Sequence, residues 1–216
     1  MNKIFYNEAN YDDDEINAVI EVLKSDNKSL VSGTKTIQFE KEISGIFGRK
    51  YGVFVNSGSS ANLLALSSLE IERSSEIITP CLTFATTIAP ILQLGLIPSL
   101  VDIDLRSLNI DVEQIEKCIN KKTKAMFIPN LIGNLPNWSK ISEIAKKYEL
   151  HVIEDSADTI GYKYNGSNSS TFFPFPHHPL RIVSANSLIS FSAPKGLRTG
   201  RVSFLIFIYL YFIKKF

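Results

Sequence analysis

The chain opens with two segments whose apolar residues recur at helical spacing. They cover residues 12–27 and 36–48. In the first segment the apolar side chains stand three and four residues apart, at Ile16, Val19, Ile20 and Leu23. This spacing predicts an amphipathic helix, and the aspartates at its start suit the positive end of a helix dipole. The second segment is predicted to be a helix that ends at Gly48.

From Tyr51 onward, short apolar runs typical of strands alternate with helical patterns. The predicted strands are residues 51–55, 76–80, 97–103, 124–132 and 150–155. The predicted helices between them are residues 59–69, 83–95, 111–120 and 139–149. This alternation predicts βαβ units and a mostly parallel sheet with helices on both faces. The fold class is therefore α/β, in three αβα layers.

Composition narrows the class of protein further. The 216 residues carry 23 basic and 22 acidic side chains, so the chain has no large net positive charge that would favour binding to nucleic acid. Cys81 and Cys118 form neither a spaced metal pair nor a disulfide framework, which favours a reducing cytoplasm. The acidic N-terminus has no apolar core typical of a signal peptide. The apolar run at residues 202–213 is shorter than the roughly 20 residues that span a bilayer.

Polar and aromatic side chains follow the predicted strands where ligands bind in open α/β sheets, at the carboxyl edge. Asp155 ends the fifth strand, and Ser57–Ser60 form a turn after the first. Hydroxyls and backbone N–H groups of that turn, at the start of a helix, are suited to a phosphate. Phe84 follows the second strand. Each feature also has an ordinary interpretation, as a solvated strand end, a helix cap and a core aromatic.

Taken together, the three features indicate one ligand. A phosphate turn, an aromatic ring and a carboxylate for a ring nitrogen are what pyridoxal 5′-phosphate (PLP) requires. A carboxylate beside the pyridine nitrogen keeps that nitrogen protonated, so that the ring can withdraw electrons. We therefore predict that Asp155 follows a buried strand because its carboxylate pairs with a protonated ring nitrogen.

Four segments resemble the DegT-type (DegT/DnrJ/StrS) sugar aminotransferases in order and spacing. They are residues 33–66, 76–104, 108–138 and 151–166. These relatives are fold-type I, PLP-dependent enzymes that act on nucleotide-linked keto sugars. The stretches "NLIGNLPNW" and "EDSADTIG" are most similar to the nucleotide-hexose 3-dehydratase branch of lipopolysaccharide deoxysugar biosynthesis. That branch uses the pyridoxamine form of the cofactor (PMP), with histidine in place of the usual lysine.

The resemblance implies a role for each matching position. Gly58 and Ser59 would hold the cofactor phosphate, Phe84 would stack on the ring, and Asp155 would pair with the pyridine nitrogen. Asp158 would lie near the phenolic oxygen.

Further implications concern structure and partners. Glu154 would be a structural carboxylate. The substrate would be a nucleotide-linked keto sugar, and relatives are homodimers with active sites at the subunit interface. For this chain a monomer or an aggregate is as much expected as a dimer.

The resemblance ends at Gly166. Residues 1–166 are therefore expected to be the front part of the PLP-binding large domain and residues 167–216 a divergent tail, with the small C-terminal domain missing. Two interpretations of the tail stay open. In one, "ISFSAPKGLRTG" is a displaced catalytic segment with Lys195 as the lysine. In the other, which the composition of the tail favours, the coding sequence changes reading frame near residue 170. Residues after that point, including His177, His178 and the apolar run at the C-terminus, would then come from the wrong frame.

Three alternatives for the function of this chain follow from these expectations. An enzyme by descent that is inactive as this chain fits a slipped frame, because the catalytic lysine or histidine would then be absent. A non-catalytic phosphate or nucleotide-sugar binding module would need only the Ser57–Ser60 turn. A non-functional remnant would need no site.

Overall fold

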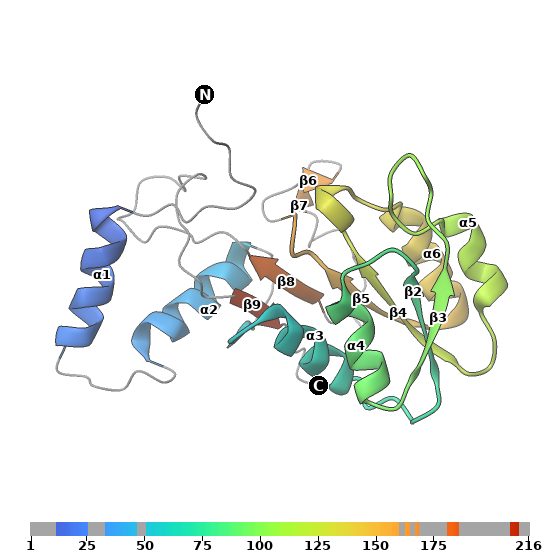
Figure 1. Cartoon of the computed structure of the whole chain (residues 1–216), viewed down its shortest axis with the longest axis horizontal. Helices are drawn as coiled ribbons and strands as arrows, with labels where there is room; N and C mark the ends of the chain where they lie inside the picture. Colours follow the sequence, from blue (N-terminus) through green and yellow to red (C-terminus); the bar gives the residue numbers. More distant parts are fainter. Residues whose placement is uncertain are drawn as a thin grey trace.

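The computed structural model describes residues 12–25, 33–46, 51–159, 163–164, 167–168, 181–185 and 208–211. Both N-terminal helices are present, α1 at Asp13–Lys24 and α2 at Thr34–Ile46. The Asp12 side chain and Glu15 form a reciprocal cap at the start of α1. The predicted apolar stripe of α1 is not buried, because its members are 38% to 61% exposed. Figure 1 shows α1 at one end of the molecule, away from the sheet.

The described strands form a seven-stranded sheet in the order β1-β9-β8-β5-β4-β2-β3. Their bounds are β1 Val53–Val55, β2 Glu76–Pro80, β3 Ile97–Val101, β4 Thr123–Pro129, β5 His151–Asp155, β8 Arg181–Ala185 and β9 Ile208–Tyr211. All neighbours from β8 to β3 are parallel, and β9 runs antiparallel to both β1 and β8. A separate antiparallel pair joins β6, Lys163–Tyr164, to β7, Ser167–Asn168. The mostly parallel α/β sheet is thus confirmed.

Helices cover both faces of the sheet (Figure 1). Helices α3, Gly58–Ser67, and α4, Ala85–Gln93, pack on one face. Helix α6, Trp138–Tyr148, and the short α5, Val112–Ile115, pack on the other. Two 3₁₀ turns complete the described helices, Glu116–Cys118 and Leu131–Gly133.

One predicted helix is shorter than expected. Residues 111–120 form α5 and a 3₁₀ turn instead of one helix, and Ile119 already has extended backbone. The Asn120 side chain accepts the Lys122 N–H at 2.8 Å, which favours a turn over a further helical turn.

The core consists of two apolar layers separated by the sheet. Alternate residues of β4 supply both: Met126 and Ile128 join the α5–α6 side, and Ala125 and Phe127 join the α3–α4 side. The same alternation places Ile153 of β5 on the α3–α4 side. Because both faces are buried, the central strands read as continuous apolar runs in the sequence.

The topology brings the carboxyl ends of the strands to one edge. Strands β2, β3, β4 and β5 are parallel, and β1 points the same way because two antiparallel pairings separate it from β8. Residues that follow these strands therefore share this edge, which positions the candidate site. In the part of the chain that the structure describes, no helix has the length and apolar character to cross a membrane.

Replacing Ile141 tests the α6 layer. Ile141 is fully buried against the sheet, so Ile141→Ala should lower the free energy of unfolding by about 2–5 kcal/mol through lost burial and a cavity. Urea denaturation measures this loss. On the same helix, Glu143→Ala changes an exposed side chain and should stay within about 0.5 kcal/mol of the wild type. Equal effects of the two changes would contradict the packing described.

Candidate functional site

Asp155 is a buried carboxylate at the carboxyl end of β5. It is 8% exposed and shares the sheet face of Ile153, toward α3 and α4. Its Oδ2 accepts a hydrogen bond from Asn62 Nδ2 at 3.1 Å, and its Oδ1 accepts the Ala157 N–H at 3.2 Å. Both donors are neutral groups. The carboxylate is therefore oriented by hydrogen bonds, and none of these partners balances its charge.

Burial raises the pKa of the Asp155 carboxyl above its ordinary value. The hydrogen bonds from Asn62 and Ala157 act in the opposite direction because they favour the charged form, while the nearby acids Asp158 and Glu154 add to the increase. A group that is costly to ionise and lies at the ligand-binding edge of an α/β sheet is a candidate for pairing with a cation.

The turn before α3 leaves backbone donors at the same edge. Ser57 caps the helix: its Oγ accepts the Ser60 N–H at 3.1 Å, and its carbonyl oxygen accepts the Ala61 N–H at 3.0 Å. The remaining N–H groups of the first turn, on Gly58 and Ser59, have no acceptor within the helix. Gly58 is buried, whereas Ser59 is exposed. The predicted phosphate turn is thus also an ordinary serine cap, with two N–H groups left over at the positive end of the helix.

Asn62 connects the site segments to one another. It lies one helical turn after Gly58, is 1% exposed, and donates from the same Nδ2 to Asp155 and to the Thr86 carbonyl oxygen, the latter at 3.0 Å. Thr86 lies in the first turn of α4, two residues after Phe84. Phe84 is 73% exposed, so its ring is not part of the core. Asn62 is not among the residues predicted from the sequence; its signal there is an amide in the turn motif "NSGSSAN".

Glu154 belongs to the opposite face and to a structural network. Its Oε1 accepts from Asn130 Nδ2 at 2.9 Å and from the Ser156 hydroxyl at 2.8 Å. Asn130 in turn accepts the Trp138 Nε1–H at 2.9 Å, and its Nδ2 lies 3.0 Å from Thr159 Oγ1. All of these side chains are buried. Glu154 therefore joins the ends of β4, β5 and α6, in agreement with its predicted structural character.

Asp158 and Lys195 are the two remaining predicted site residues. Asp158 is exposed in the turn after β5, and its backbone carbonyl oxygen faces Gly133 of the loop after β4. Lys195 lies outside the described residues, as does most of the apolar run at 202–213. Among the described residues, no group of three or more His, Cys, Asp or Glu side chains could hold a metal ion.

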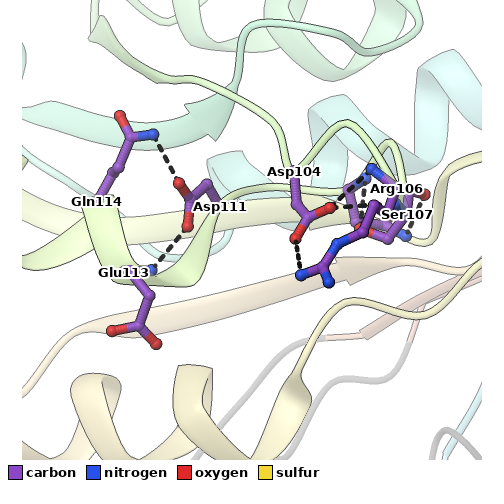
Figure 2. Close-up of polar contacts among 7 residues, drawn as sticks. Asp104, Arg106, Ser107, Asp111, Glu113 and Gln114 are labelled. Atoms are coloured by element: carbon purple, nitrogen blue, oxygen red, sulfur yellow. Dashed lines mark hydrogen bonds and ion pairs between the residues drawn. The ribbon is translucent and has the colours of Figure 1, made fainter.

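A separate cavity of about 430 Å³ lies on the α5–α6 side. Its lining is Asp104, Arg106, Ser107, Ile110, Asp111, Val112, Glu113, Leu135, Pro136 and Asn137. Figure 2 shows that the carboxylates of Asp104 and Asp111 accept hydrogen bonds from residues two or three positions along the chain. Asp111 accepts from Glu113 N at 3.1 Å and from Gln114 Nε2 at 2.6 Å, which caps α5. Asp104 accepts from Arg106 N at 2.7 Å and Nη2 at 3.2 Å. These acids therefore stabilise the loop between β3 and α5.

The chain belongs to the DegT/DnrJ/EryC1/StrS aminotransferase family, whose model matches residues 9–201. The match extends past Gly166, where the resemblance found in the sequence ends, and it includes Lys195. The predicted family is confirmed.

Individual relatives share one third or more of the aligned residues. The GDP-4-keto-6-deoxy-D-mannose 3-dehydratase of Yersinia pseudotuberculosis is 34% identical over 182 residues, which are 80% of this chain and 46% of that protein. The lipopolysaccharide biosynthesis protein RfbH of Salmonella typhimurium is 39% identical over 151 residues, 66% of this chain and 35% of that protein. The chain thus spans about half the length, or less, of these curated relatives.

Solved structures give the same result for the fold. The E. coli GDP-4-keto-6-deoxy-D-mannose-3-dehydratase with bound hydrated PLP superimposes with a TM-score of 0.73 at 33% identity, over 82% of this chain and 45% of that one. The fold is therefore that of the large domain of fold-type I PLP-dependent enzymes, as predicted. The predicted cofactor class is also confirmed for the family.

The burial of Asp155 predicts a pH effect on stability. Because the folded state holds the Asp155 proton more tightly than the unfolded chain, stability from this group is present below an unfolded pKa of about 3.9 and is lost as pH rises through the raised folded pKa. Asp155→Asn should remove this loss of stability at higher pH, because an amide does not ionise. Urea midpoints of the ligand-free chain, measured from acid to neutral pH, test the difference. Parallel pH profiles for both proteins would contradict it.

Proposed function

We propose that this chain is the cofactor-binding part of a PLP- or PMP-dependent enzyme that acts on a nucleotide-linked keto sugar. The family assignment supports the cofactor and the general chemistry. Among the two reaction types in the family, 3-dehydration and amino transfer, similarity to two named GDP-4-keto-6-deoxy-D-mannose 3-dehydratases supports the first. The similarity to RfbH supports a role in lipopolysaccharide biosynthesis.

The observation that carries the proposal is the buried Asp155, held by neutral donors and close to a free helix N-terminus. A protonated ring nitrogen would supply the missing positive charge and offset the cost of burying the carboxylate. Asn62 lies one turn along α3 from Gly58 and donates a hydrogen bond to Asp155, so α3 connects the phosphate turn to the carboxylate. The residues present therefore fit a phosphorylated pyridine.

Each predicted site residue has a specific role in the proposed function. The N–H groups of Gly58 and Ser59 bind the phosphate, and the exposed ring of Phe84 covers one face of the pyridine. Asp155 would hold a proton on the ring nitrogen, and Asp158 would be the residue for the phenolic oxygen, as the family resemblance implies. When bound, the cofactor supplies an electron-withdrawing ring. Lys195 is the candidate for moving a proton at the substrate carbon, on the interpretation that the tail is a displaced catalytic segment.

Introducing a carboxylate at the phosphate turn tests the binding mode. Ser59→Asp should weaken PMP binding about tenfold, since roughly 1.4 kcal/mol of charge repulsion near a protein surface corresponds to that factor. The same change should leave the free energy of unfolding equal or slightly higher, because an acid suits a helix N-terminus. Equilibrium dialysis and urea denaturation measure the two effects. PMP is the suitable probe because it lacks the aldehyde that reacts with surface lysines.

Ser67 provides the matched control. It is also an exposed serine, at the other end of α3. Ser67→Asp should keep wild-type PMP affinity while lowering stability by about 0.3–1 kcal/mol, since an acid is unfavourable at a helix C-terminus. An unchanged affinity of Ser59→Asp would contradict phosphate binding at this turn, and absence of PMP binding by the wild type would contradict the proposed function.

Borohydride reduction in the presence of PLP tests Lys195. Because tail composition favours a slipped frame, we expect label spread over Lys163, Lys195 and the terminal lysines, as nonspecific amine chemistry produces. Peptide mapping by mass spectrometry locates the label. Label confined to Lys195 and abolished by Lys195→Ala would instead identify Lys195 as the catalytic lysine and contradict a frame slip before it.

A further inference from the structure

The environment of Asn62 is unusual for a buried residue in a helix. Its Nδ2 donates to two acceptors on two other elements, Thr86 O on α4 and Asp155 Oδ2 on β5. Its Oδ1 is buried and has no hydrogen-bond partner in the described part of the chain. A buried polar atom without a partner lowers stability and is uncommon in folded proteins. The amide is therefore poorly explained by helix packing alone.

Pro90 explains why one of these acceptors is available. In a helix, the carbonyl oxygen of Thr86 would accept the N–H of the residue four positions later, which is Pro90 and has no N–H. Asn62 Nδ2 supplies the missing donor at 3.0 Å. The backbone of α4 thus holds the side chain of Asn62 in place independently of any ligand.

This anchor also fixes which way the amide points. Exchanging its oxygen and nitrogen would place the amide oxygen against a carbonyl oxygen and a carboxylate oxygen, both of which are acceptors. The donor orientation toward Asp155 is therefore dictated by the two partners. A leucine of similar size would fill the space but could donate to neither.

We propose that Asn62 is a positioning residue for Asp155: it fixes the carboxylate plane and keeps the carboxylate charged, so that Asp155 can hold a proton on the ring nitrogen of the cofactor. This inference rests on the proposed function. The charged form needs this support because two further acids, Asp158 and Glu154, lie close enough to oppose ionisation of Asp155. The described counteracting groups are the Asn62 amide and the Ala157 N–H.

The test uses the full chain loaded with PMP that carries ¹⁵N at the ring nitrogen. The ¹⁵N chemical shift reports whether that nitrogen is protonated, independently of any turnover. In the wild type the nitrogen should stay protonated to alkaline pH. In Asn62→Leu we expect the pH of deprotonation to fall by about one unit and PMP to bind about tenfold more weakly, which is the size of effect of losing one hydrogen bond to a charged group.

A second variant and a control separate positioning from folding. Asn62→Asp keeps the side-chain shape, but its new carboxyl can donate only when protonated. Its PMP affinity should therefore recover toward acid pH, a profile that a merely structural role does not produce. Thr87→Val removes a different, partly buried hydrogen bond at the start of α4, from Thr83 Oγ1 to the buried Thr87 Oγ1 at 3.0 Å, and should leave the ¹⁵N titration unchanged.

The outcomes distinguish this inference from the function on which it rests. If the wild type binds PMP and both Asn62 variants titrate like the wild type, Asn62 has no positioning role and the proposed function stands. If the wild type binds no PMP, the proposed function is wrong and the inference falls with it. If Asn62→Leu does not fold, Asn62→Asp provides the test: recovery of its PMP affinity toward acid pH supports the positioning role, and a pH profile like that of the wild type contradicts it.

Discussion

The hydrogen bonds of one amide group connect the segments from which the candidate site is built. Asn62 Nδ2 binds the first turn of α4 and the end of β5, while Asn62 itself belongs to the helix that begins at the phosphate turn. The missing N–H of Pro90 makes the first of these bonds possible. Without the amide, the segments of the phosphate turn, Phe84 and Asp155 would be held together by the apolar packing of α3 and α4 on the sheet, with no polar contact between them through Asn62.

The pleat of β5 gives its last two acids different environments. Consecutive residues of a strand point to opposite faces, so Glu154 lies on the α6 side and Asp155 on the α3–α4 side. Glu154 accepts from Asn130 and Ser156 and stabilises the ends of β4 and β5. The described hydrogen-bond partners of Asp155 are neutral and leave its charge uncompensated. One carboxylate is therefore structural and its neighbour is available for a ligand, although both end the same strand.

Polar groups that lower stability are found on the α3–α4 side of the sheet. Burial makes the Asp155 charge costly, and the Oδ1 atom of Asn62 has no partner among the described residues. The core on either side of the sheet is otherwise mainly apolar. A protein tolerates such groups where a ligand can compensate for them, which agrees with the proposal that a cationic ring binds there.

The sequence alone determined the order of strands and helices from β1 to β5, their parallel arrangement and the edge at which Asp155 and the serine turn lie, because all of these depend on local periodicity and chain topology. It did not predict β6 to β9 or the division of residues 111–120 into α5 and a 3₁₀ turn. It did not reveal the roles of Asn62 or Asn130. The Asn62 contact joins residues 93 positions apart, and the exposure of the α1 stripe depends on what packs against it. Local patterns contain no information about partners that distant, so only the tertiary structure decided which amide binds which acid.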